Sequence, residues 1–141
     1  MSARFLVVTL SLAAITACSG RTLLYSASSL GSTPPQDAYA CVTDQVKKLG
    51  YRVRAHDDDR HRILAERDNP EIREANGLFR RGFDRLEITS SPDASGQTEV
   101  EIRAQSFKES VTARGNTLDE IEATAQAKAD SKTILAACAA G

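Results

Sequence analysis

Two stretches of the chain alternate apolar and polar side chains residue by residue, and this pattern constrains the fold more than any other feature of the sequence. In segment 85–89, Leu86 and Ile88 alternate with charged or hydroxyl residues, and in segment 99–105 apolar residues again occupy every second position. Successive residues of a β-strand point to opposite faces, so both segments are predicted to be strands with one apolar and one polar face. The Ser-, Pro- and Gly-containing segment 90–96 predicts the loop of a hairpin between them.

A second pair of short strands is predicted upstream of this hairpin. Segment 51–56 alternates apolar with basic side chains, the acidic segment 57–60 predicts a turn, and segment 62–66 predicts the return strand. The polar faces of these strands carry charges of both signs, which indicates cross-strand ion pairs on a solvated surface. An antiparallel sheet of this kind needs cover on its apolar face only.

Two amphipathic helices are predicted near the ends of the domain, and they would provide that cover. The first begins at 33–35, because proline is favoured in the first turn, and ends at Gly50. The second opens at Thr117, with Glu120 completing a capping box, and runs to Cys138. The apolar stripe of the first helix consists of Ala38, Cys41, Val42, Val46 and Leu49.

The predicted element order is therefore α-β-β-β-β-α, which indicates an α+β fold. We expect a two-layer sandwich in which a four-stranded antiparallel sheet carries both helices on one face. The chain has 141 residues, which is enough for one such domain over residues 34–141.

The first eighteen residues have the order of features that an export signal requires. Arg4 precedes an apolar run over 5–15, which is too short to span a bilayer as a helix, and small residues then lead to Cys18. The sequence Ile-Thr-Ala-Cys at 15–18 resembles the lipobox of bacterial lipoproteins. The alternatives are an ordinary secretory signal with an incidental cysteine and an uncleaved anchor.

The resemblance implies that residues 1–17 are a signal peptide and that Cys18 carries acyl chains such as palmitate, which hold the mature chain to a membrane. Serine rather than aspartate at position 19 implies the outer membrane, facing the periplasm, in a Gram-negative cell. Residues 18–33 are rich in Ser, Thr and Gly and are predicted to be a tether. Its apolar segment 23–25 either dips into the membrane interface or packs on the domain as a short strand.

Two cysteines, Cys41 and Cys138, remain for the exported domain. Disulfides persist in exported proteins, and an even count predicts one bridge between them. The bridge would join the two helices and close a loop over most of the domain, which chain entropy values at about 4–5 kcal/mol. The alternative is a pair of buried free thiols.

Composition excludes several classes of function. The chain has 18 basic and 19 acidic residues and no Trp, so neither bulk charge nor an aromatic surface favours binding of nucleic acid. It contains no Walker, GxSxG, HExxH or dinucleotide-binding motif. We therefore expect neither a cofactor nor an enzymatic activity.

Both histidines lie at the tip of the first predicted hairpin. His56, Asp58 and His61 are candidate ligands for zinc, copper or nickel, because these metals accept imidazole and carboxylate groups. The alternative is a solvated turn with no bound ion.

The connection 68–82 is long for a compact domain, and such connections are often functional. Within it, Leu78 and Phe79 form an apolar pair followed by the two positive charges of Arg80 and Arg81. This segment is a candidate contact for a partner protein or for anionic lipid headgroups. The alternative is that Leu78 and Phe79 cover the edge of the core.

Together these features predict a membrane-anchored envelope lipoprotein whose domain is a non-enzymatic interaction or assembly module. Its expected partners are membrane lipid, through the acylated N-terminus, and another envelope protein. The alternative function is a periplasmic metal- or small-ligand-binding protein that uses the tip at 56–61.

Overall fold

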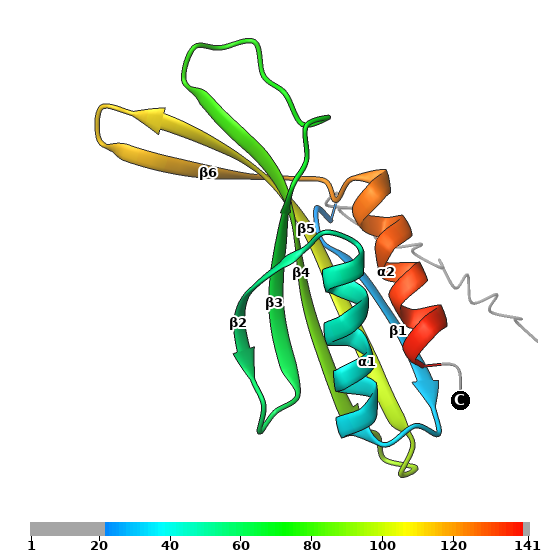
Figure 1. Cartoon of the computed structure of the whole chain (residues 1–141). Helices are drawn as coiled ribbons and strands as arrows, with labels where there is room; N and C mark the ends of the chain where they lie inside the picture. Colours follow the sequence, from blue (N-terminus) through cyan, green and yellow to red (C-terminus); the bar gives the residue numbers. More distant parts are fainter. Residues whose placement is uncertain (1–21, 140–141) are drawn as a thin grey trace, which may run out of the picture.

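The computed structural model describes residues 22–139, which form an α+β fold of two helices and an antiparallel sheet (Figure 1). The predicted fold class is confirmed, but the prediction of four strands is wrong, because the described residues form six. In chain order the elements are β1 (Tyr25–Gly31), α1 (Pro35–Lys48), β2 (Arg52–Asp57), β3 (Arg62–Asp68), β4 (Phe79–Pro92), β5 (Thr98–Thr112), β6 (Gly115–Ile121) and α2 (Ala125–Cys138).

The sheet is built around the long hairpin of β4 and β5. The strand order is β1-β5-β4-β3-β2, and β6 also pairs with β5. β1 pairs with residues 98–104 of β5 and β6 with residues 106–112, so these two strands lie end to end along one edge of β5. Gln105, at the middle of β5, separates the two pairings.

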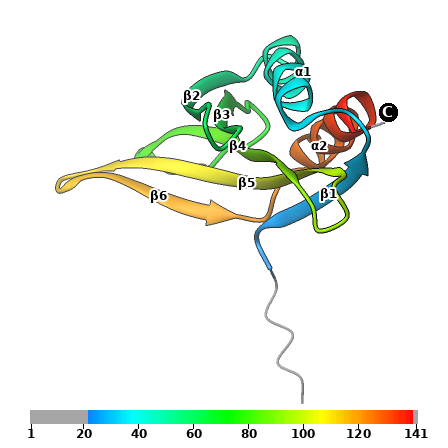
Figure 2. The same cartoon turned by 90° about the horizontal axis from the view of Figure 1, so that it is seen from below.

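The alternating residues of the β4–β5 hairpin form the centre of the core, as predicted. Leu86 pairs with Ala104 and Ile88 with Ile102, and each of the four side chains is at most 1% exposed. Both helices lie on this apolar face of the sheet (Figure 2). α1 contributes its buried residues Ala38, Val42 and Val46.

The first helix begins and ends close to the predicted residues. Pro34 is its N-cap and Pro35 its first residue, and no side chain caps the first turn. Gly50 adopts a φ of +82°, a left-handed conformation that ends helices and favours glycine. This turn places Tyr51 in the core, where it is 3% exposed.

The second helix begins later than predicted. The proposed capping box at Thr117 and Glu120 lies instead in β6, which pairs with Ser106–Thr112 of β5. The actual N-cap is Thr124, whose hydroxyl accepts a hydrogen bond from the Ala127 amide. A capping box is a local signal, and here hydrogen bonds to β5 prevail over it.

The segment predicted to be a tether also requires a correction. Residues 25–31 of the predicted tether 18–33 form β1, an edge strand of the sheet. Its exposure alternates, with Tyr25 and Ala27 partly buried against the core. Pairing with β5 satisfies backbone groups that a solvated tether would leave to water, and this stabilises the strand despite its Ser-rich sequence.

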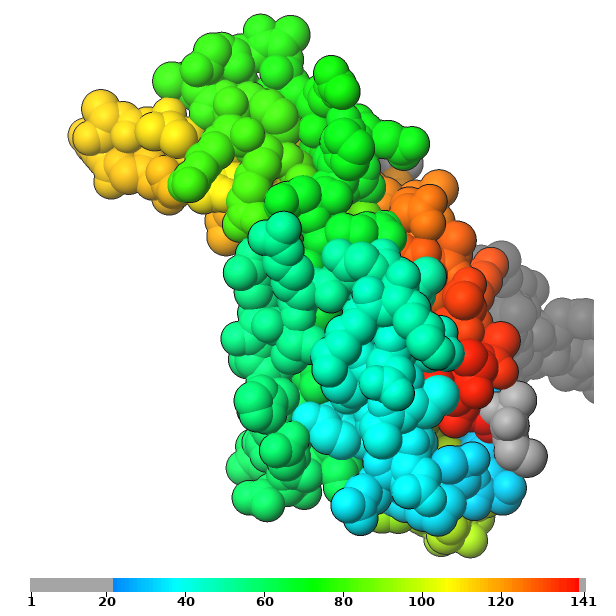
Figure 3. All heavy atoms as spheres, viewed as in Figure 1, coloured from blue at the N-terminus to red at the C-terminus, as the bar shows by residue number. Residues whose placement is uncertain are grey.

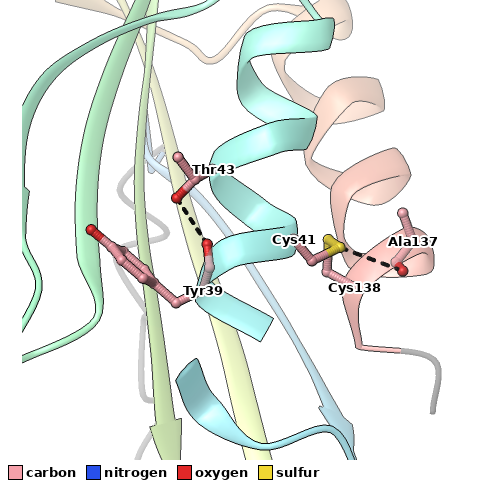
Figure 4. Close-up of a disulfide and its surroundings, with 5 residues drawn as sticks. All are labelled: Tyr39, Cys41, Thr43, Ala137 and Cys138. Atoms are coloured by element: carbon pink, nitrogen blue, oxygen red, sulfur yellow. Dashed lines mark hydrogen bonds between the residues drawn. A yellow bond between two sulfur atoms is a disulfide. The ribbon is translucent and has the colours of Figure 1, made fainter. Parts of the chain in front are cut away.

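A disulfide joins the two helices. Cys41 of α1 and Cys138 of α2 are bonded through their sulfurs, and their Cα atoms lie 5.6 Å apart (Figure 4). The two residues are 97 positions apart, so the bridge closes a loop that contains five of the six described strands.

Candidate functional site

The sheet extends beyond the helices that cover it. β4 has 14 residues and β5 has 15, but α1 and α2 cover only one end of this hairpin (Figure 1). We call the uncovered part, residues 79–84, 106–112 and 115–121, the distal sheet. Among the helices and strands of residues 22–139, β6 contacts β5 alone. Figure 3 shows the end of the β5–β6 hairpin, in yellow, projecting from the body of the molecule.

A buried polar cluster lies where the covered and uncovered parts of the sheet meet. Its centre is Asp84 of β4, which is fully buried on the same face as Leu86. The Asp84 carboxylate accepts hydrogen bonds from Ser106 Oγ at 2.6 Å, Thr124 Oγ1 at 2.8 Å and Asn69 Nδ2 at 2.8 Å. These bonds connect β4 to β5, to the start of α2 and to the loop after β3.

Arg67 extends the cluster towards α2. Its guanidinium lies 2.7 Å from the Asp130 carboxylate, 3.6 Å from that of Asp84, and 4.5 Å from the centre of the Tyr51 ring. Tyr51 donates its hydroxyl proton to Asp130 at 3.0 Å. Burial raises the pKa of Tyr51 far above its usual range, although the positive charge of Arg67 opposes this. The buried carboxylates of Asp84 and Asp130 and the hydroxyl of Tyr51 therefore all have hydrogen-bond or ion-pair partners. We interpret the cluster as a rigid connection between the distal sheet and the part of the sheet that the helices cover.

The sequence analysis missed this cluster, although it contains a signal for it. Asp84 occupies the same alternating series as Leu86 and Ile88, so it had to face the core. A carboxylate on an apolar face requires hydrogen-bonding partners, because an isolated buried charge is costly. Local patterns could not identify those partners, since Asn69, Ser106 and Thr124 come from distant segments.

On its other face, the distal sheet carries two stacked aromatic rings. Phe83 and Phe107 are cross-strand partners with ring centres 5.3 Å apart. The guanidinium of Arg81 lies 4.5 Å from the centre of Phe83, and that of Arg85 lies 4.6 Å from the centre of Phe107. These cation–π contacts and the ring stacking stiffen the part of the sheet that no helix covers.

Glu109 of β5 pairs with both arginines that the sequence analysis singled out. Its carboxylate accepts hydrogen bonds from Arg81 Nε and, at 3.2 Å, from Arg80 Nη1. Asn116 donates a further bond at 2.8 Å. Arg81 and the other donors hold the pKa of Glu109 below its usual range. The expected pair of free positive charges is therefore partly neutralised by a buried carboxylate.

An open groove of about 480 Å³ lies between the loop 69–78 and the start of β4. Ile72 is buried against Gly82, where any side chain on position 82 would collide with it. The glycine therefore lets the loop close over the strand. The groove is lined by Asp68, Asn69, Pro70, Ile72, Arg73, Glu74, Phe79, Arg80, Arg81 and Gly82.

The predicted contact residues lie at this groove and beside it. Phe79 is half-buried in the groove, whereas Leu78 is 56% exposed, so the alternative that both residues cover the edge of the core does not hold for Leu78. The Val111 amide donates to the Leu78 carbonyl at 2.8 Å, and Val111 is 46% exposed. Leu118, on the neighbouring strand, is 51% exposed. Sequence reasoning had placed Leu118 in a helix and so missed this cluster.

We call this cluster the distal surface. It consists of the exposed residues Leu78, Val111 and Leu118 together with Arg80 and Arg81, which pair with Glu109, whereas Phe79 pairs with Ser110 and lines the groove on the other face.

The predicted metal ligands do not form a metal centre. His56 Nε2 lies 3.9 Å from an Asp58 carboxylate oxygen, whereas the ring of His61 packs against Tyr39 with centres 5.5 Å apart. Tyr39 donates to Asp58 at 2.7 Å, and partial burial together with this bond raises the pKa of Tyr39 to about 12. Over residues 22–139, no three metal-ligating side chains converge.

The charged faces of the strands form the expected ion pairs. Glu66 of β3 pairs with Arg85 at 2.7 Å and with Arg54 at 3.2 Å. Farther along the sheet, Arg62 pairs with Glu87 at 2.7 Å. These pairs leave little unmatched charge for an anionic ligand on this face.

Comparison with known proteins assigns no family to the chain. No protein-family model matches its sequence, and no curated protein matches it significantly. The predicted acylation site Cys18 and the signal segment 1–17 lie outside the described residues. Within residues 22–139, neither helix is long and apolar enough to cross a membrane.

Proposed function

We propose that this protein is a lipid-anchored envelope lipoprotein whose domain is a non-enzymatic module that binds another protein of the envelope. The observation that carries the proposal is the distal surface. Leu78, Val111 and Leu118 are large apolar residues that are about half exposed, and they gather on the part of the sheet that projects beyond the helices. Clustered exposed apolar residues with a polar rim are typical of protein-binding sites.

The surroundings of this surface support a binding role. The two-layer sandwich of helices and sheet serves as the scaffold, and the buried cluster around Asp84 fixes the distal sheet to it. Arg80 and Arg81 form the polar rim, and their pairing with Glu109 keeps them in place. A rigid surface loses little conformational entropy when a partner binds.

The localisation follows from the N-terminal sequence. The lipobox-like residues 15–18 favour cleavage before Cys18 and its acylation, and Ser19 favours the outer membrane of a Gram-negative cell. The alternative function, metal or ligand binding at the tip 56–61, has no group of three ligands to support it.

Site-specific photo-cross-linking in living cells tests the binding role. A photoreactive phenylalanine analogue replaces Leu118 in the full-length chain, and a matched control replaces Leu30, which is equally exposed but lies on β1 at the other end of the sheet. We expect the probe at Leu118, but not at Leu30, to yield a discrete adduct with an envelope protein. The charge-introducing variant Leu78→Asp should abolish this adduct without lowering the melting temperature.

Three outcomes would contradict the proposal. Equal adducts from both positions would indicate unspecific proximity, and an adduct that survives Leu78→Asp would place the partner elsewhere. A large loss of stability in Leu78→Asp would show instead that Leu78 belongs to the core.

A further inference from the structure

The described chain begins beside two exposed leucines. Leu23 and Leu24 are 37% and 39% exposed, and both precede β1. The Leu23 carbonyl accepts a hydrogen bond from the Ala123 amide at 3.0 Å, and Tyr25 pairs with Ala104. The backbone is thus fixed to the body of the domain at this point, while two apolar side chains remain on the surface.

This point lies at the middle of the sheet rather than at one of its ends. β1 starts opposite Ala104, β6 ends opposite Ser106, and Gln105 between them is the central residue of β5. Figure 2 shows the start of β1, in blue, on the side of the sheet away from α1 and α2. At this point Leu23 and Leu24 each keep more than a third of their surface exposed.

The distance along the chain to the proposed acylation site is short. Leu24 is six residues after Cys18. At 3.3–3.6 Å per residue, a fully extended chain would place Leu24 at most about 22 Å from Cys18, and any bend would bring it closer. Acyl chains on Cys18 would hold that residue at the membrane surface, so Leu23 and Leu24 cannot lie far from the lipid headgroups.

We propose that Leu23 and Leu24 insert into the membrane interface and seat the domain on the bilayer. The inference rests on the acylation of Cys18 in the proposed function, and it adds a second, side-chain contact with lipid. Acyl chains combined with an apolar side-chain contact bind membranes more firmly than either does alone. This membrane contact, near Gln105 at the middle of β5, would place the distal surface to one side of the acylated N-terminus. Val111 of the distal surface lies six positions beyond Gln105, which is about 20 Å along β5.

Single tryptophans test the seat directly, because the chain contains no Trp of its own. The acylated full-length variants Leu24→Trp and Leu30→Trp are reconstituted into vesicles of phosphatidylethanolamine and phosphatidylglycerol, with and without brominated acyl chains. Leu30 is a matched control, since it is 50% exposed on β1, six residues and about 20 Å beyond Leu24. We expect bromolipids to quench Leu24→Trp at least twofold and Leu30→Trp hardly at all.

The outcomes separate this inference from the proposed function. Mass spectrometry of each variant first establishes acylation of Cys18, and a chain without acyl groups overturns both proposals. Acylated protein in which Leu24→Trp is no more quenched than Leu30→Trp overturns the seat alone. A blue shift of Leu24→Trp that depends on protein concentration but not on lipid would assign the leucines to a second copy of the chain and also overturn it.

Discussion

Arg67 of β3 forms an ion pair with the buried carboxylate of Asp130 in α2, with 2.7 Å between the charged atoms. The same guanidinium lies 3.6 Å from Asp84, so one cation stands between two buried carboxylates. It also donates to the Leu49 carbonyl at 2.9 Å, where α1 ends. Arg67 therefore connects both helices to the sheet, close to where the distal sheet begins.

Loss of this cation should destabilise the fold strongly. In Arg67→Met, the apolar stem is kept, but Asp84 and Asp130 lose their positive partner, and we expect a loss of about 3–5 kcal/mol in the free energy of unfolding. Arg54→Met is the matched control, because Arg54 pairs with Glu66 at a half-exposed position, and its loss should cost at most about 1 kcal/mol. Urea unfolding measures both. Equal effects of the two variants would contradict the role assigned to Arg67.

The start of α2 can be tested with two threonines. Thr124→Ala removes the acceptor for the Ala127 amide and a donor to Asp84, so we expect a loss of about 1–3 kcal/mol. Thr117→Ala should change stability by no more than about 0.5 kcal/mol, because Thr117 is exposed in β6. Circular dichroism during urea unfolding reports the difference. A larger effect at Thr117 would support the helix start predicted from sequence.

The disulfide should contribute to stability through the long loop it closes. The double variant Cys41→Ser/Cys138→Ser should lose about 2–5 kcal/mol, because the unfolded chain regains the freedom of a loop spanning 97 positions. Differential scanning calorimetry gives the change in melting temperature. Adding a thiol reductant to the natural chain should lower its melting temperature in the same way, and an unchanged transition would argue against the bond.

Glu109 should make stability depend on acid. Because Arg81 and its other donors lower the pKa of Glu109 in the folded state, its contribution is complete above the ordinary glutamate pKa of about 4.3 and is lost as the pH falls through the lower folded value. Glu109→Gln should therefore be less stable than the natural chain at neutral pH, and this difference should shrink between about pH 5 and pH 3.

Urea unfolding at several pH values measures this difference. The control is Glu99→Gln, since Glu99 has no ion-pair partner among residues 22–139. A Glu109→Gln deficit that stays constant down to pH 3 would disprove the ionic contribution.

The elements predicted correctly are those whose signal is local. The alternation over 85–89 and 99–105 requires strands, and the stripe through Val42 and Val46, ended by Gly50, requires a helix, whatever the rest of the chain does. For the distal surface, the sequence singled out only Leu78 and the three residues after it, as an apolar pair with positive charges, and placed Leu118 in a helix.

The sequence by itself determined the α+β class, the antiparallel pairing and the extent of α1, because periodicity and terminal residues act within a few positions. Only the tertiary structure decided that 25–31 and 115–121 are strands, since their backbone groups find partners on β5 and not within their own segments. It also decided what Asp84 binds, because its partners come from three separate segments. A buried polar group is satisfied by whatever the whole fold brings to it, and no local pattern records that.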